Sequence, residues 1–333
     1  MLSVVCPIYN EEKYIAKCID SILAQDYPRD DLEIILVDGI STDHTRDIVE
    51  EYLRIYPFII LMDNPKRIAP CAMNIGIKAS KGDVIIRLDA HATYPTNYFS
   101  TLVKYLHELN ADNVGCICET KSVKQTPEAI AIAKVMSDKF GVGNSKFRVG
   151  TTEEYLEADT VPFGCFKRSV FDRVGYYNEY LIRGQDIELN KRIKRAGGKI
   201  VLISSIKCTY IPRDNYADFF RNRYLTGLWV IKSCFILKRM NNSGIRHFIP
   251  ALFFLSIVLP LLATIIFKYS CLLSFAVLLV YLALILSRSI KICPKDSNVW
   301  AMIKAFTCLH FGYSLGSMKG LLIGLFKRTQ LTK

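Results

Sequence analysis

The stretch 83–91, Asp-Val-Ile-Ile-Arg-Leu-Asp-Ala-His, joins a short apolar run directly to polar residues. Two further runs have the same form: 2–8 (LSVVCPI) precedes Tyr-Asn-Glu-Glu, and 32–38 (LEIILVD) precedes Gly-Ile-Ser. Helical patterns lie between these runs, and strands that alternate with helices are typical of a parallel sheet with right-handed crossovers. In such sheets ligands bind beyond the carboxyl ends of the strands. We therefore expect an α/β domain whose site lies where these runs end.

The 333 residues carry a net charge of +12 that is unevenly distributed. The net charge is −6 over 1–187, +10 over 188–247 and +8 over 248–333. The positive charge lies beside and within the most apolar part of the chain, which favours an anionic membrane surface over nucleic acid as a partner. The 11 cysteines show no zinc-ligand spacing, so we interpret them as reduced thiols of the core.

Two uncharged stretches near the C-terminus have the length of membrane spans. Residues 248–267 provide twenty uncharged residues and 270–286 seventeen, with Lys268 and Tyr269 between them. A third stretch, 306–326, has glycines at every fourth position, a spacing typical of close helix contact in a bilayer. These glycines are Gly312, Gly316, Gly320 and Gly324. The alternative for the first two stretches is a pair of buried helices in a soluble core.

Basic residues flank these stretches, and such residues prefer the cytoplasmic side of a membrane. They precede the first stretch, follow the second (Arg288, Lys291) and close the chain at Lys333. This pattern predicts two spans with a third helix that does not cross. The N-terminus begins a strand at once and has no signal-peptide pattern. We expect a multi-pass protein of the inner (cytoplasmic) membrane whose soluble part is cytoplasmic.

No glycine-rich phosphate-binding motif occurs in the chain. G-x-G-x-x-G does not follow the first strand, and G-x-x-x-x-G-K-[ST] is absent throughout. A diphosphate would have to be held in another way. Asp89 and His91, two residues apart at a strand end, could hold a divalent ion that bridges phosphate oxygens. The alternative is that both are ordinary capping or loop residues.

Asp186 stands at the start of a predicted helix that ends at Gly197-Gly198. The commonest role of an aspartate at such a position is to cap the helix. The functional alternative is a general base that is exposed at the helix start, with Gln185 beside it.

Five motifs together resemble those of the inverting glycosyltransferases of family 2, which have the GT-A fold. In chain order the motifs are Pro7-Ile8-Tyr9-Asn10-Glu11-Glu12, 37–45 (VDGISTDHT), Asn74-Ile75-Gly76 with 79–83 (ASKGD), Asp89-Ala90-His91 and Gln185-Asp186. The resemblance extends from residue 2 to about 227. The triplet at 89–91, the stretches 161–168 (VPFGCFKR) and 184–200, and the apolar C-terminus look most like the branch that extends bacterial exopolysaccharide repeat units, such as the succinoglycan glucosyltransferases.

The resemblance implies a role for each matching residue. It assigns nucleotide-sugar binding to Pro7, Tyr9, Glu11, Asp38, Asp89 and Ala90, with Asp38 accepting a hydrogen bond from the base. Asp89 and His91 would hold a divalent cation, Mn²⁺ or Mg²⁺, and His91 stands where the family usually has a second aspartate. Asp186 would deprotonate the acceptor hydroxyl, which attacks C1 of the donor sugar from the face opposite the diphosphate.

Arg221 and Arg223 occupy the place where processive relatives carry a Gln-x-x-Arg-Trp motif. Because this chain has no glutamine there and Tyr224 follows Arg223, we expect addition of a single sugar. Gln185 and the two arginines are candidates for contacting the acceptor or the diphosphate, and an ordinary juxtamembrane basic helix explains the arginines equally well. The predicted domains are a GT-A catalytic domain over 1–230, a basic juxtamembrane segment over 231–247 and a membrane region over 248–333.

Three functions remain open from the sequence. In the first, the enzyme transfers a hexose from a nucleotide diphosphate sugar, such as a UDP-sugar, to a sugar hydroxyl of a polyprenyl-diphosphate-linked saccharide. In the second, polyprenyl phosphate itself is the acceptor. The third is a non-catalytic sugar-nucleotide-binding scaffold of a membrane assembly complex, and the presence of Asp186 argues against it.

Overall fold

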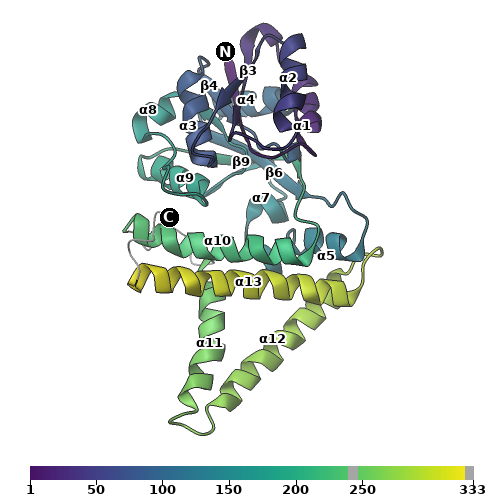
Figure 1. Ribbon diagram of the computed structural model, residues 1–333, viewed down its shortest axis with the longest axis vertical. Helices are drawn as coiled ribbons and strands as arrows, with labels where there is room; N and C mark the ends of the chain where they lie inside the picture. The colour runs from purple at the N-terminus through teal and green to yellow at the C-terminus, as the bar shows by residue number, and fades with distance from the viewer. Residues whose placement is uncertain (239–246, 327–333) are drawn as a thin grey trace. The chain divides into compact units, whose positions relative to one another are not determined.

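The computed structural model of the chain describes residues 1–238 and 247–326 (Figure 1). Its contacts define two compact units. Unit 1 comprises 1–119 and 146–210, and unit 2 comprises 120–145 and the described residues from 211 onward. The units divide the chain at other points than the predicted domain boundaries at 230 and 247, which stay predictions. The basic residues Arg239, Arg246 and Lys333 lie outside the described residues.

In the described part of the chain, unit 1 is built on a nine-stranded sheet with the order β3-β2-β1-β4-β8-β6-β9-β5, in which β7 also pairs with β9. The strands are β1 (Leu2–Ile8), β2 (Leu32–Asp38), β3 (Ile59–Asp63), β4 (Val84–Arg87), β5 (Ala92–Thr93), β6 (Asn113–Thr120), β7 (Tyr155–Glu157), β8 (Cys165–Lys167) and β9 (Ile200–Tyr210). The three runs expected to be strands therefore correspond to β1, β2 and β4. These strands and β3 are parallel, whereas β8 pairs antiparallel with β4.

Helices cover the sheet of unit 1 on both faces. They are α1 (Ile15–Leu23), α2 (Thr45–Ile55), α3 (Ala69–Ala79), α4 (Tyr98–Glu108), α7 (Lys146–Val149), α8 (Ser169–Val174) and α9 (Gln185–Arg195), with a 3₁₀ turn over Arg29–Asp31. Alternate residues of one strand enter different cores: Val4 packs in the core with α1 and α4, and Val5 in the core with α3 and α9. Strands buried on both faces read as continuous apolar runs, which is why the sequence predicted them clearly.

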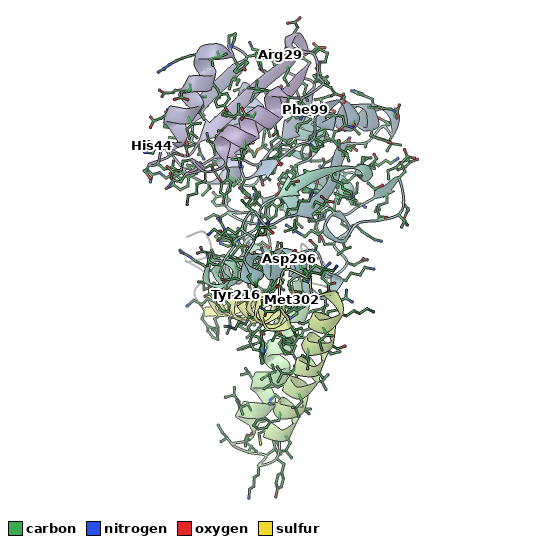
Figure 2. All side chains as sticks on the ribbon, turned by 90° about the vertical axis from the view of Figure 1, so that its right-hand side faces the viewer. Arg29, His44, Phe99, Tyr216, Asp296 and Met302 are labelled. Atoms are coloured by element: carbon green, nitrogen blue, oxygen red, sulfur yellow. The ribbon has the colours of Figure 1, made fainter. Side chains whose placement is uncertain are left out.

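Unit 2 is helical in the described residues. Its helices are α5 (Pro127–Val135), α6 (Lys139–Val142), α10 (Tyr216–Ile236), α11 (Ile249–Ala263), α12 (Cys271–Ile292) and α13 (Val299–Phe326). The long helices α10 and α13 run side by side (Figure 1). Near one end of this pair Tyr216 lies beside Met302 (Figure 2), and the Tyr216 hydroxyl donates a hydrogen bond to the Ala301 carbonyl at 3.0 Å.

Glycines of α13 allow its backbone to approach α10 closely. A Cβ at Gly312 would lie 2.9 Å from the carbonyl oxygen of Phe220, and one at Gly320 would lie 2.7 Å from that of Leu228. A Cβ at Gly316 would collide with the carbonyl oxygen of Tyr224. The four-residue glycine spacing therefore marks a close helix contact, as the sequence predicted, and its partner is α10.

The membrane prediction is confirmed only in part. Within the described residues, α12 is the one helix that is both long enough and apolar enough to cross a membrane. The stretch 248–267, expected to be a twenty-residue span, is helical only as α11, whose 15 residues are shorter than a bilayer crossing requires. The expectation of two full-length spans is therefore not supported, although both helices expose apolar side chains (Figure 2).

Helix α11 ends at Ala263, before the predicted end of the span at 267, because its last turn forms a different set of hydrogen bonds. The Pro260 carbonyl accepts hydrogen bonds from the hydroxyls of Thr264 (3.2 Å) and Ser270 (2.8 Å). The amides of Thr264 and Ile265 bond three residues back, to Leu261 and Leu262. Such bonds tighten the last turn of a helix and end it.

Candidate active site

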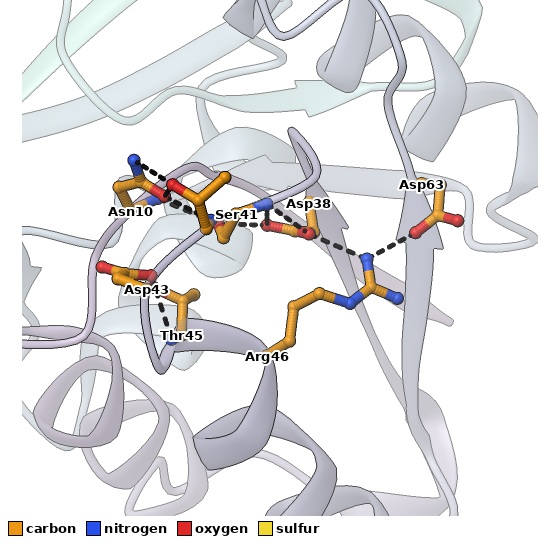
Figure 3. Close-up of polar contacts among 8 residues, drawn as sticks. Asn10, Asp38, Ser41, Asp43, Thr45, Arg46 and Asp63 are labelled. Carbon is orange, nitrogen blue, oxygen red and sulfur yellow. Dashed lines mark hydrogen bonds and ion pairs between the residues drawn. The ribbon is translucent and has the colours of Figure 1, made fainter.

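The carboxyl ends of three parallel strands lie in register at one edge of the unit 1 sheet. Ile8 pairs with Asp38, and Asp38 with Asp63. The loops beyond these ends are tied together: the amide of Asn10 donates to the Ser41 hydroxyl at 2.9 Å, and the Asn10 carboxamide oxygen accepts from the Thr42 amide at 2.8 Å (Figure 3). The expected position of the site is thus a rigid, polar edge.

The Asp38 carboxylate is fully buried and already has donors in the chain. It accepts hydrogen bonds from the amide (3.0 Å) and hydroxyl (2.5 Å) of Ser41 and from Arg46 (2.8 Å). Arg46 also contacts Asp63 at 2.6 Å, so that one guanidinium connects two strand ends (Figure 3). The sequence analysis missed Arg46 and Asp63. The available signal was the aspartate that ends the next apolar run, 59–63. In the structure this residue, Asp63, lies in register with Asp38.

Tyr9 offers an exposed aromatic ring beside this edge. Its side chain is 42% exposed, and the ring lies against Gly39, where a Cβ would come within 2.9 Å of the ring. Any larger residue at 39 would displace the ring. Pro7, just before it on β1, is half-buried.

Asp89 and His91 follow β4, and both are partly exposed. Tyr94 holds the Asp89 backbone, donating to its carbonyl (3.2 Å) and accepting from its amide (2.9 Å), and Ala90 is buried. The His91 ring faces Glu11, with 3.3 Å between Nδ1 and Oε1. Burial alone would raise the pKa of Asp89, but Arg87 and His91 outweigh it and the net pKa is lowered. Asp89 is therefore ionised at neutral pH.

These residues fit a divalent cation only together with a bound diphosphate. No group of three His, Cys, Asp or Glu side chains in the described ranges is close enough to hold a metal. Magnesium sites of nucleotide-binding enzymes, however, are commonly one or two protein ligands plus phosphate oxygens. Metal-binding imidazoles usually donate their other ring N–H to a carboxylate, and Glu11 has that position relative to His91.

Asp186 is the second residue of α9 and does not cap it. The N-cap residue is Gly184, and no side chain caps this helix. The Asp186 carboxylate instead contacts the guanidinium of Arg87 on β4, which also binds Asp89. The side chain is 38% exposed. The surrounding protein removes water from the rest of the carboxylate, which raises its pKa, while Arg87 opposes this rise.

The loop before α9 is fixed by a buried asparagine. The Asn74 carboxamide donates to the Tyr177 carbonyl (2.9 Å) and to Glu179 (3.0 Å) and accepts from the Tyr177 amide (2.9 Å). Lys66 contacts Glu179 at 2.6 Å. These bonds tie the segment between α8 and α9 to α3.

The remaining predicted residues are distributed over both units. Gln185 is buried at the first position of α9 in unit 1. Arg221 and Arg223 lie on α10 of unit 2, the first exposed and the second packed over the Phe219 ring at 5.7 Å. Unit 1 therefore unites Tyr9, Glu11, Asp38, Asp89, His91 and Asp186, and it adds Arg87, which the sequence analysis missed. An arginine inside a buried strand must find a carboxylate partner, and this was the available signal.

Comparisons with known proteins agree with this architecture. The glycosyl transferase family 2 profile matches residues 3–175. The chain is 30% identical over 249 residues to the succinoglycan biosynthesis protein ExoA of Rhizobium meliloti, covering 74% of this chain and 73% of that protein. It is also 30% identical over 228 residues to a dolichyl N-acetyl-alpha-D-glucosaminyl phosphate 3-beta-D-2,3-diacetamido-2,3-dideoxy-beta-D-glucuronosyltransferase of Methanococcus voltae, covering 66% of this chain and 70% of that protein.

Two solved structures share the fold at low sequence identity. The mannosyltransferase PcManGT of Pyrobaculum calidifontis, in complex with GDP-Man and Mn²⁺, has a TM-score of 0.58 and 20% identity and covers 96% of this chain and 86% of its own. Residues 1–349 of S. aureus TarS, in complex with UDP-GlcNAc, have a TM-score of 0.53 and 18% identity. This match covers 98% of this chain and 91% of that one. The sheet and its polar edge thus define a GT-A-like glycosyltransferase. The chain belongs to glycosyl transferase family 2 and is an enzyme of polysaccharide or glycan biosynthesis.

Proposed function

We propose that this enzyme transfers a hexose from a UDP-sugar, with inversion, to a sugar hydroxyl of a polyprenyl-diphosphate-linked saccharide. The observation that carries the proposal is the Asp186 carboxylate. It is open to solvent on one side, has a raised pKa and is joined through Arg87 to Asp89 at the strand ends. A general base works best when its pKa approaches the working pH.

The donor nucleotide binds at the edge formed by β1 and β2. The exposed Tyr9 ring can stack on the base, and the rigid loop around Asp38 can accept its N–H groups. Pro7, Glu11 and Ala90 complete this part of the pocket. Solved relatives of the same fold in complex with UDP-GlcNAc or GDP-Man support a nucleotide sugar as the donor class.

Asp186 removes the proton from the acceptor hydroxyl as its oxygen attacks C1 of the donor sugar. The bond from C1 to the diphosphate oxygen breaks on the opposite face, its electron pair leaves with the nucleoside diphosphate, and the anomeric configuration inverts. Asp186 ends the step protonated and returns its proton to solvent. Gln185, Arg221 and Arg223 are candidates for orienting the acceptor or the diphosphate.

A divalent cation, Mn²⁺ or Mg²⁺, held by Asp89, His91 and the diphosphate, would neutralise the charge that develops on the leaving group. The PcManGT complex, which contains Mn²⁺, supports a divalent cation as the cofactor. Within the chain, Glu11 and Tyr94 orient the two ligand residues.

The acceptor is lipid-linked, and the enzyme works at the cytoplasmic face of the inner membrane. Support comes from the exposed apolar side chains of α11 and α12 and from the net charge of +8 over residues 248–333. The Methanococcus voltae relative, whose name describes a sugar on dolichyl phosphate, supports this acceptor class. A base such as Asp186 suits a sugar hydroxyl better than polyprenyl phosphate, which already carries a nucleophilic oxygen anion.

The test is to incubate the full-length enzyme with radiolabelled nucleotide sugars and bacterial lipid extracts. We expect label on a lipid-linked oligosaccharide, in a bond of inverted configuration. Label on polyprenyl phosphate itself would establish the second function, and binding of donor without any transfer would establish the scaffold.

A further inference from the structure

Arg87 contacts the two carboxylates to which the proposed function assigns different tasks. Its Nε and Nη2 donate to Oδ1 of Asp89 at 3.2 and 3.0 Å, and its Nη1 donates to Oδ1 of Asp186. The two aspartates come from distant parts of the chain, the end of β4 and the start of α9. A single guanidinium therefore joins the donor side of the site to the base.

Only arginine can make this connection from the middle of the sheet. The Arg87 side chain is 8% exposed, and the Tyr177 ring lies 6.0 Å from its guanidinium carbon. A buried cation must be paired, and the planar guanidinium offers donors in several fixed directions, whereas an ammonium acts as a point charge. The fixed directions of the guanidinium donors explain how one arginine can hold two carboxylates at a fixed separation.

Each aspartate contributes only one oxygen to Arg87. The hydrogen bonds from Arg87 to Asp89 and to Asp186 all end on Oδ1 of the carboxylate. The contact to Arg87 thus leaves the second oxygen of Asp186 for the acceptor proton. It likewise leaves the second oxygen of Asp89 for the cation and diphosphate on the donor side of the site.

We propose that Arg87 is the positioning residue of the reaction: by holding Oδ1 of both aspartates, it presents Oδ2 of Asp186 to the acceptor hydroxyl at a fixed distance from the donor. This inference rests on the proposed function, because it requires Asp186 to be the base. Small displacements of a reacting group are costly, since about 1 Å of misplacement can reduce a rate by roughly 10²-fold. Arg87 therefore acts on the rate of transfer more than on donor binding.

The experiment compares Arg87→Lys with Arg168→Lys in the full-length enzyme. Arg168 is a matched control, because it is a half-buried arginine of unit 1 that donates to the carbonyls of Gly82 and Ile77 and to the Ser80 hydroxyl. Lysine at 87 keeps the charge but cannot hold both carboxylates. We expect kcat to fall by about 10²-fold with a much smaller change in donor KM, whereas Arg168→Lys keeps kcat near wild type. An equal fall in both variants would assign the effect to general loosening and overturn the proposal.

A double-mutant cycle with Asp186→Asn separates this inference from the function on which it rests. If Arg87 acts through Asp186, the double variant is no slower than Asp186→Asn alone. Wild-type kcat in Arg87→Lys beside an inactive Asp186→Asn would overturn the positioning role and leave the base in place. Full activity of Asp186→Asn would overturn both.

Folding is checked in every variant by the rise in unfolding temperature on adding UDP. Arg87→Gln is the second variant, because it keeps hydrogen-bond donors and removes the charge. If neither variant folds with nucleotide, Arg87 is a structural residue and the proposal is wrong.

Discussion

Asp186 is the residue whose replacement should separate donor binding from transfer. Asparagine keeps the size of the side chain and removes its basicity, so transfer should fall by roughly 10²- to 10⁴-fold while UDP still binds. Initial rates and nucleotide titrations measure the two effects. Glu188 is the control, because it is buried in an ion pair with Arg192, at 2.9 Å, on the same helix. Loss of transfer in Glu188→Gln with intact binding, or normal transfer in Asp186→Asn, would contradict the assignment of the base.

The raised pKa of Asp186 predicts the pH dependence of the rate. The base must be ionised to accept a proton, so kcat should fall as the pH falls through its pKa. Because burial raises that pKa above the ordinary 3.8, the acid limb of the kcat profile should lie at a higher pH than an exposed aspartate would give. A profile measured at saturating donor and acceptor tests this. An acid limb at or below pH 3.8 would mean that the essential base is another group.

His91 should affect metal use rather than folding. In His91→Ala, the Mn²⁺ concentration that gives half of the UDP-dependent rise in unfolding temperature should increase by roughly tenfold or more, since a cation ligand is lost. His44→Ala is the matched control, because His44 is an exposed histidine of unit 1 whose ring contacts Asp47 and whose amide donates to Glu12. Equal Mn²⁺ requirements in both variants would make His91 an ordinary loop residue.

At the scale of elements, the tight contact of α10 and α13 predicts an unusual effect of alanine. An alanine in place of glycine inside an exposed helix stabilises it by about 1 kcal/mol. Gly316→Ala should instead destabilise the protein by about 1–2 kcal/mol, because the new methyl group meets the Tyr224 carbonyl, which cannot move without shifting a helix. Thermal unfolding in detergent measures the change. Leu315→Ala, at the partly exposed neighbouring position, should cost less, and a Gly316→Ala protein as stable as wild type would refute this packing.

The sequence predicted those elements whose signal is local. Strands β1 and β2 have the predicted bounds, and β4 lies inside the predicted run, since continuous apolar segments describe strands covered on both faces. The antiparallel pairing of β8 with β4 was not predictable in this way, because it depends on contacts between segments about 80 residues apart. The length of α11 was missed for a related reason: Ser270, beyond the helix, takes the carbonyl of Pro260.

The candidate site was predicted residue by residue but not as a set of contacts. Asp89 and Asp186 were recognised from motifs, whereas their shared partner Arg87 appeared only as one polar letter in an apolar run. A one-dimensional pattern records that a buried charge needs a partner. It does not record which carboxylate, 99 positions further on, the fold will supply.

For the whole molecule, the α11–α12 hairpin gives a prediction about where the two ends of the chain lie. Both ends of the hairpin contact other parts of unit 2: Ser314 on α13 donates to the Pro250 carbonyl at the start of α11, and Arg288 near the end of α12 contacts Asp138, the residue before α6. We therefore propose that the hairpin enters the membrane and returns to the same side, so that a reporter fused to the C-terminus and one fused to the N-terminus are both active on the cytoplasmic side. A C-terminal reporter active only in the periplasm would show that α12 alone crosses.

Unit 2 is assembled from two parts of the chain, and this order affects its synthesis on the ribosome. Helices α5 and α6 are made before β9, but α13, which packs against both of them, follows more than a hundred residues later. At roughly 5–20 residues per second, the early helices wait on the order of ten seconds before their apolar faces can be covered. During that interval the sheet of unit 1 can be completed, whereas unit 2, to which residues 120–145 belong, can form only after α13 has been made.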